Sequence, residues 1–180
     1  HHTVPKYEWR FRHMESREDQ IYASVLSHAD DRIGQVLDTL DRLGLTDNTL
    51  VIFSSDNGPA RASGPTELEL GYDTATGAGW GIAASKGTTG GRKGYKASLF
   101  EGGINVPFIA RWPGKIKPGS QSDELLCLAD MLATSAALVG EPLPAGAGPD
   151  SFNLLPALLG EKPKKPLREH LVIQTNAGRA

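Results

Sequence analysis

The chain has 180 residues, which is enough to bury a hydrophobic core in about one domain. A hydrophobic content of 39% and a charged content of 22% are ordinary for a globular protein. The net charge of −2 and the scattered Lys and Arg residues argue against a nucleic-acid surface. No apolar run approaches the roughly 18 residues that a membrane-spanning helix needs. The single cysteine, Cys127, excludes an internal disulfide, and we expect it to be a small core residue.

The first predicted element is a long helix that begins after Ser16 and ends before Gly44. Ser16 is a suitable N-cap, and apolar residues then recur at three- and four-residue steps as far as Leu43. Gly44 follows the last of them, as a helix terminator would. After a short loop, the apolar run at residues 50–53 predicts a strand buried on both faces. A helix, a short loop and a buried strand together indicate an α/β sheet.

The later elements are less regular. Residues 59–94 are rich in Gly, Ala, Thr and Ser, which predicts a long loop of the kind that is often functional. The remaining predicted elements are a strand at residues 106–112, a helix at 123–139 ended by Gly140, a short apolar turn or helix at 152–159 and a third strand at 171–173.

Two oxygen-bearing side chains follow the first predicted strand directly. Asp56 and Asn57 offer a carboxylate and an amide oxygen, the donors that hard cations such as Ca²⁺ prefer. Strand ends are also where α/β sheets keep their binding sites. The tripeptide Asp-Asn-Gly is equally a favoured turn sequence, and taken alone it favours a turn without a ligand role. A cation would need further oxygen ligands from elsewhere in the protein.

A lysine-bearing loop precedes the second predicted strand. In isolation Lys96 is a solvated surface lysine, and Lys86 and Lys93 are equally available. Lys86 begins the sequence KGTTGG, but without GxxxxGK[ST] spacing it is not part of a phosphate-binding P-loop. Gly102 and Gly103 permit a tight turn before the strand, so that Lys96 could lean back over the Asp56 end of the first strand. A cation site and a fixed positive charge together suit an anionic ester.

The chain opens with two histidines, His1 and His2. They are either the remnant of a purification tag or the remainder of a motif that reads His-His-Thr-Val-Pro.

Together these motifs resemble the sulfatase family of the alkaline-phosphatase-like superfamily. The resemblance runs through VIFSSDNGP, GYKASLFEGGINVP, the RWPG of residues 111–114 and SFNLLPALLGE. It implies an α/β alkaline-phosphatase-like sandwich with a mostly parallel central sheet flanked by helices, present here as a partial domain. Residues 1–165 would be the C-terminal part of the sulfatase catalytic domain. Residues 166–180 would begin the small C-terminal subdomain.

The resemblance also implies roles for individual residues. Asp56 and Asn57 would bind one divalent cation, usually Ca²⁺, as an incomplete ligand set. Lys96 would contact a sulfate oxygen, as both a catalytic and a substrate-binding residue. A family histidine contacts the sulfate ester or its leaving oxygen, and His1, then His2, is the candidate for it.

The family's nucleophile is a formylglycine made within C/S-x-P-S-R, and no such motif occurs in these 180 residues. We therefore expect the nucleophile in a missing N-terminal part, and we expect the chain alone to be inactive. The implied activity is that of a sulfuric ester hydrolase, in which a hydrated aldehyde attacks the sulfur of a sulfated small molecule or carbohydrate.

Two other functions stay open. One is a phosphatase or phosphodiesterase of the same superfamily, although two-metal sites need more donors than the downstream sequence offers. The other is a catalytically inactive sulfatase-like binding module. The resemblance implies a periplasmic, extracellular or lysosomal location. The sequence determines neither the compartment, nor the sulfate ester, nor the oligomeric state.

Overall fold

The structure is a computed structural model that describes residues 4–59, 89–162 and 164–174. It consists of two compact units. The first unit contains His1–Gly44 and Asn57–Val106, and the second contains Leu45–Asp56 and Pro107–Ala180. In the described ranges, every helix is too short or too polar to cross a membrane.

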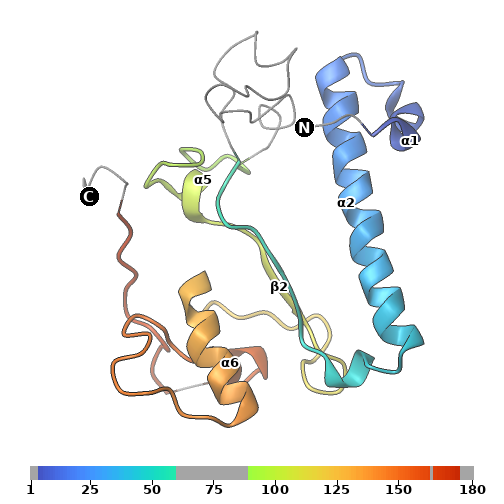
Figure 1. The fold of residues 1–180 in the computed structure, drawn as a ribbon. Helices are drawn as coiled ribbons and strands as arrows, with labels where there is room; N and C mark the ends of the chain where they lie inside the picture. Colours follow the sequence, from blue (N-terminus) through green and yellow to red (C-terminus); the bar gives the residue numbers. More distant parts are fainter. Residues whose placement is uncertain (1–3, 60–88, 163, 175–180) are drawn as a thin grey trace. The chain divides into compact units, whose positions relative to one another are not determined.

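The first unit is dominated by α2 (Arg17–Arg42), as the sequence predicts (Figure 1). The Ser16 hydroxyl accepts a hydrogen bond from the amide of Asp19 at 3.2 Å, which confirms the expected N-cap. Gly44 follows the C-cap with φ of +67°, the left-handed conformation that glycine adopts most readily. The local signals at both ends of this helix therefore act as the sequence indicates.

α2 is packed against α1 (Pro5–Glu8), which leads into the single 3-10 turn η1 (Trp9–Phe11). Tyr7 is almost fully buried, and its hydroxyl donates a short hydrogen bond to the carboxylate of Asp31 on α2. This hydrogen bond, aided by the charge of Lys6, lowers the pKa of Asp31 below its ordinary value. Tyr7 thus anchors the N-terminal helix to the long helix.

Much of the apolar stripe on α2 is not covered within its own unit. Ile21 is buried, but other apolar positions further along the helix expose more than a third of their surface: Leu26, Ile33, Val36 and Leu43. The helical period was predicted correctly, whereas burial along the stripe is confined to the end that contacts α1.

The remaining element of the first unit is α5 (Glu101–Ile104), a single helical turn. The sequence predicted a tight backbone turn at Gly102 and Gly103. Both glycines instead lie inside this turn, and both are buried.

The second unit contains a ribbon of two strands, β1 (Val51–Ser54) and β2 (Phe108–Arg111), paired antiparallel with Val51 opposite Arg111. The cross-strand pair Phe53 and Ile109 is 45% and 60% exposed. The expectation that the first strand is buried on both faces, as in a parallel sheet, is therefore wrong within this ribbon. The apolar run marked a strand correctly but did not reveal its partner or direction.

Hydrogen bonds also join the segments at both ends of the ribbon. A 3-10 turn, η2 (Thr46–Asn48), precedes β1, and the indole nitrogen of Trp112 donates a hydrogen bond to the carbonyl of Asp47 at 3.0 Å. At the other end, the Ser54 hydroxyl donates to the carbonyl of Pro107 at 3.0 Å.

The rest of the second unit contains η3 (Leu128–Asp130), α6 (Met131–Val139) and α7 (Leu155–Leu158). The helix predicted at residues 123–139 therefore begins later than expected, although Gly140 ends it in the left-handed conformation with φ of 77°. Cys127 is half-buried before η3, so its assignment to the core is wrong in degree. Residues 171–173 form no strand.

Candidate active site

The Asp-Asn-Gly sequence lies where the chain passes from one unit to the other. Asp56 is the exposed last residue of the segment that carries β1, two residues beyond the end of the strand. Asn57 opens the returning segment of the first unit, is half-buried, and donates a hydrogen bond from its side-chain nitrogen to the carbonyl of Gly58 at 2.9 Å. This hydrogen bond uses the amide nitrogen, whereas a cation would bind the side-chain oxygen.

Within the first unit, the segment after Asn57 is hydrogen-bonded to the Lys96 loop along the backbone. The amide of Gly58 donates to the carbonyl of Gly103 at 2.8 Å. The amide of Lys96 donates to the carbonyl of Pro59 at 2.9 Å. The structure thereby brings the turn that carries Asn57 and the loop that carries Lys96 into direct backbone contact.

Close backbone approach explains why this part of the chain is rich in glycine. A Cβ on Gly58 would lie 1.9 Å from the carbonyl oxygen of Gly102, and one on Gly102 would lie 2.2 Å from that of Gly94. A Cβ on Gly103 would lie 2.4 Å from the carbonyl oxygen of Tyr95. We call Gly58, Gly94, Gly102 and Gly103 the glycine seam. At Gly58, Gly102 and Gly103 no side chain fits without moving the backbone, and at Gly94 a Cβ would meet the side chain of Ser98. The seam therefore fixes the separation of turn and loop.

The Lys96 loop itself has a strained conformation. Lys96 is half-buried, and the next residue, Ala97, has φ of 69°, which is unusual for a residue with a Cβ. The Ser98 hydroxyl accepts a hydrogen bond from the Tyr95 amide at 3.2 Å, and the Ser98 amide donates to the Tyr95 carbonyl at 3.0 Å. Such strain persists only where surrounding contacts fix the backbone, as the glycine seam does here.

An open hollow lies on this loop, lined by residues 93–98 together with Phe100. The ammonium group of Lys93 lies 3.9 Å from the centre of the Phe100 ring. Arg92 is paired instead with Glu101, at 3.8 Å between Nε and a carboxylate oxygen.

The two predicted site histidines, His1 and His2, lie outside the described residues. The described part of the chain contains no group of three or more His, Cys, Asp or Glu residues able to hold a metal ion. Asp56 and Asn57 nevertheless have the oxygen donors that a hard divalent cation prefers, so they fit as part of a ligand set.

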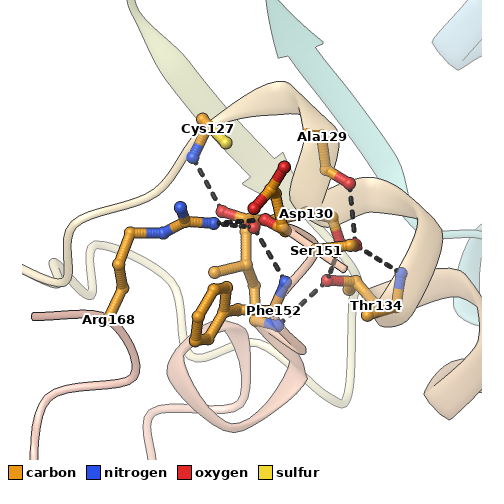
Figure 2. Close-up of polar contacts among 10 residues, drawn as sticks. Cys127, Ala129, Asp130, Thr134, Ser151, Phe152 and Arg168 are labelled. Atoms are coloured by element: carbon orange, nitrogen blue, oxygen red, sulfur yellow. Dashed lines mark hydrogen bonds and ion pairs between the residues drawn. The ribbon is translucent and has the colours of Figure 1, made fainter. Parts of the chain in front are cut away.

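Sequence reasoning missed a buried polar cluster in the second unit (Figure 2). Asp130 is fully buried, and its carboxylate accepts hydrogen bonds from the backbone amides of Cys127 and Phe152 at 2.8 and 2.9 Å. It also accepts a short, charge-assisted hydrogen bond from Arg168, whose guanidinium lies over the Phe152 ring at 4.3 Å.

Thr134 and Ser151 extend this cluster, each bridging two backbone groups. The Thr134 hydroxyl donates to the carbonyl of Asp130 at 2.7 Å and accepts from the amide of Leu154 at 2.9 Å. The Ser151 hydroxyl donates to the carbonyl of Ala129 and accepts from the amide of Ala133 (Figure 2). Asp130, Thr134 and Arg168 are buried, and with Ser151 they hydrogen-bond groups on both sides of the cluster. The cluster therefore holds the segment around α7 to α6.

Comparison with known proteins identifies the family of this chain. The sulfatase family model matches residues 2–141. The chain belongs to the sulfatase family. The match includes both Asp56-Asn57 and Lys96, and the family's α/β alkaline-phosphatase-like fold agrees with the fold class predicted from the sequence.

Individual sulfatases show the extent of the likeness. The chain is 40% identical over 152 residues to an N-acetylgalactosamine-6-O-sulfatase of Bacteroides thetaiotaomicron, covering 83% of this chain and 27% of that protein. It is 39% identical over 140 residues to the steryl-sulfatase of Rattus norvegicus, covering 77% of this chain and 22% of the relative. The chain thus spans about a quarter of the length of the curated sulfatases it matches.

A solved sulfatase structure from work on glycosaminoglycan metabolism by Bacteroides thetaiotaomicron is 40% identical in sequence. It matches with a TM-score of 0.59, covering 76% of this chain and 26% of the solved chain. Sulfatases use a divalent cation, which agrees with the expectation that the protein binds one.

Proposed function

We propose that the protein hydrolyses sulfate monoesters and that this chain supplies Lys96, Asp56 and Asn57 to the active site. The observation that carries this proposal is the backbone connection between the Asn57 turn and the Lys96 loop through the glycine seam. A rigid connection of this kind holds a cation ligand and a lysine at a constant separation, which preorganised electrostatic catalysis requires.

Lys96 has the chemistry to act on the sulfate group directly. A sulfate monoester carries a negative charge, and further charge develops on the leaving oxygen as the S–O bond breaks. The ammonium group of Lys96 would donate hydrogen bonds to a sulfate oxygen and neutralise part of this charge. Because the loop is fixed, the backbone of Lys96 is already in place when the substrate binds. Less reorganisation is then needed than for a lysine on a mobile loop.

Asp56 and Asn57 would hold the divalent cation, which we propose to be Ca²⁺. Both offer oxygen atoms, the donor type that Ca²⁺ takes in sets of about six to eight. When bound, the cation supplies positive charge that orients the sulfate group and the nucleophile. We propose a formylglycine for that nucleophile, and one of His1 and His2 as the histidine that contacts the ester.

Other expectations from the sequence remain proposals of the same kind. The substrate would be a sulfated small molecule or carbohydrate, and the compartment periplasmic, extracellular or lysosomal. The subdomain boundary near residue 165 also stays a prediction. The ion pair between Asp130 and Arg168 crosses that position.

The decisive experiment uses the full-length protein that carries this chain. Wild type should hydrolyse an aryl sulfate, and Lys96→Ala should lower kcat by about a hundred- to a thousandfold, the usual cost of removing one such charge-stabilising donor. Lys115→Ala is the matched control, since Lys115 is an exposed lysine of the other unit.

Assays with an aryl phosphate, run in parallel, address the superfamily alternative. Faster hydrolysis of the phosphate than of the sulfate would favour a phosphatase. Hydrolysis of neither by the intact protein would favour an inactive binding module. Equal kcat values for wild type and Lys96→Ala would overturn the role proposed for Lys96.

A further inference from the structure

The Lys96 loop carries a second lysine that the proposed reaction does not use. Lys93 and Lys96 both line the open hollow described above. Arg92, their basic neighbour, is paired with Glu101. In the described residues Lys93 contacts the Phe100 ring and has no carboxylate partner. Lys93 therefore adds to the hollow a positive charge that no acidic side chain in the described part of the chain pairs with.

Lys93 places a positive charge in the same hollow as Lys96. A ligand with two anionic groups can pair one of them with each ammonium group, whereas a ligand with one anionic group bound at Lys96 leaves the charge of Lys93 unpaired. The position of Lys93 over the Phe100 ring makes the charge available, because the cation–π contact restricts the flexible side chain without neutralising it.

The hollow also exposes aromatic surface. Tyr95 is 41% exposed and Phe100 is 50% exposed, and both belong to its lining. Aromatic rings offer flat faces with partial negative charge, on which the C–H groups of a ring-shaped ligand pack. Both a sugar and a sterol have such C–H groups, so the rings alone do not choose between them. The charge of Lys93 favours a sugar with a second anionic group, since a sterol monosulfate has no such group.

We propose that Lys93, with the exposed rings of Tyr95 and Phe100, binds a second anionic group of the substrate next to the sulfate held by Lys96. The substrate class is then an acidic glycan, whose second group is a carboxylate or another sulfate on the neighbouring sugar. This inference rests on the proposed sulfatase function and adds a specificity determinant to it.

The test compares two substrates in the full-length protein: a sulfated disaccharide with a uronate carboxylate, and an aryl monosulfate. Lys93→Met keeps the aliphatic stem against Phe100 and removes only the charge. We expect it to lower the ratio of kcat/KM for the disaccharide to that for the aryl sulfate by about three- to tenfold, mainly through KM. Lys93→Arg should restore the ratio, and Lys117→Met is the control at an exposed lysine of the other unit.

A disulfated disaccharide without a carboxylate distinguishes the two kinds of anionic group. If Lys93→Met affects only the uronate substrate, the second group is a carboxylate, and if it affects both disaccharides, the position accepts either. Equal loss on the aryl sulfate and the disaccharides would overturn the proposal, because it would show a structural role for Lys93. No change in the ratio would overturn it as well.

Failure of the proposed reaction is separable from failure of this inference. If wild type hydrolyses no sulfate ester, calorimetric titration of the same disaccharides into wild type and Lys93→Met measures the second anion position directly. Weaker binding to Lys93→Met, most marked at low salt, would support the position without the reaction. Equal binding, or none to either protein, would overturn it.

Discussion

The amide of Gly58 donates a hydrogen bond to the carbonyl of Gly103 at 2.8 Å, across 45 positions of sequence. This bond joins the turn after Asn57 to the one-turn helix that follows the Lys96 loop. Because Gly58 has no side chain, the two backbones approach more closely than any other residue would allow. The proposed active site therefore depends on a backbone contact between two glycines, which have no side chain to take part in the reaction.

Gly58→Ala should destabilise the first unit and separate the turn from the loop. The added Cβ would lie 1.9 Å from the carbonyl oxygen of Gly102, which is backbone and cannot rotate away. We expect a loss of about 1–3 kcal/mol in the free energy of unfolding. Urea denaturation followed by circular dichroism measures it.

Gly34→Ala provides a control with the opposite sign. Gly34 lies within α2, and a Cβ there meets nothing within 4 Å. Alanine in a helix interior is more favourable than glycine by about 0.5–1 kcal/mol, so this variant should be more stable than wild type. If the two alanine variants shift stability equally, close approach at Gly58 is not the cause.

The sequence predicted best what local chemistry determines. The Ser16 cap and the Gly44 terminator act within one turn of the helix, so their patterns are visible without knowledge of the fold. The family motifs assigned the Asp-Asn-Gly turn and the Lys96 loop to one site, and the roles of their residues there stay predictions. Contact between the turn and the loop was suggested by the motifs alone, since nothing in the periodicity of either segment indicates it.

Features that depend on distant partners could not be predicted. The ribbon joins β1 to β2, and an apolar run does not state which strand it pairs with or in which direction. Asp130 looked like one more residue in an amphipathic helix, but its carboxylate binds Arg168, 38 residues later. The same carboxylate accepts a hydrogen bond from the amide of Cys127, which is the N-cap residue of η3. Helical structure therefore begins only after Cys127.

The Asp130–Arg168 pair should be among the most sensitive positions in the second unit. Arg168→Met retains a long side chain over Phe152 but leaves the buried carboxylate without its charged partner. Breaking a buried pair from one side costs about 3–5 kcal/mol, and we expect a loss of that order in the free energy of unfolding. Chemical denaturation of wild type and variant measures the difference.

Ser135→Ala is the control for this cluster, since Ser135 lies on α6 next to Thr134 but is exposed. Thr134→Val should fall between the two, with a loss of about 1–3 kcal/mol, because it leaves the amide of Leu154 without its acceptor. Similar stabilities for Arg168→Met and Ser135→Ala would show that the ion pair does not anchor the unit.

The contact between α1 and α2 should weaken in acid. The hydrogen bond from Tyr7, with the nearby charges of Lys6 and Arg10, lowers the pKa of Asp31 below its ordinary value. A lowered folded-state pKa gives stability that is fully present above the unfolded value, about 3.9, and is lost as the pH falls through the folded value. Protection of α2 amides around Asp31 from hydrogen exchange should therefore decrease below about pH 4.

Two variants test the cause of this pH dependence. Asp31→Asn removes the titrating group, so its protection should no longer change over that range. Asp30→Asn changes an exposed neighbour and should behave as wild type does. An unchanged acid response in Asp31→Asn would assign the effect to another carboxylate.

The cation site can be tested by removing the charge of Asp56 and the amide group of Asn57, its two proposed ligands. In the full-length protein, chelation should abolish sulfate hydrolysis, and added Ca²⁺ should restore it. Asp56→Asn keeps an oxygen donor but removes the charge, so the Ca²⁺ concentration for half-maximal binding should rise about ten- to a hundredfold. Asn57→Ala removes a donor and should also weaken binding, whereas Asp123→Asn, at an exposed carboxylate of the second unit, should not. Calorimetric titration of Ca²⁺ reads binding without relying on activity, and equal affinities for wild type and Asp56→Asn would remove Asp56 from the ligand set.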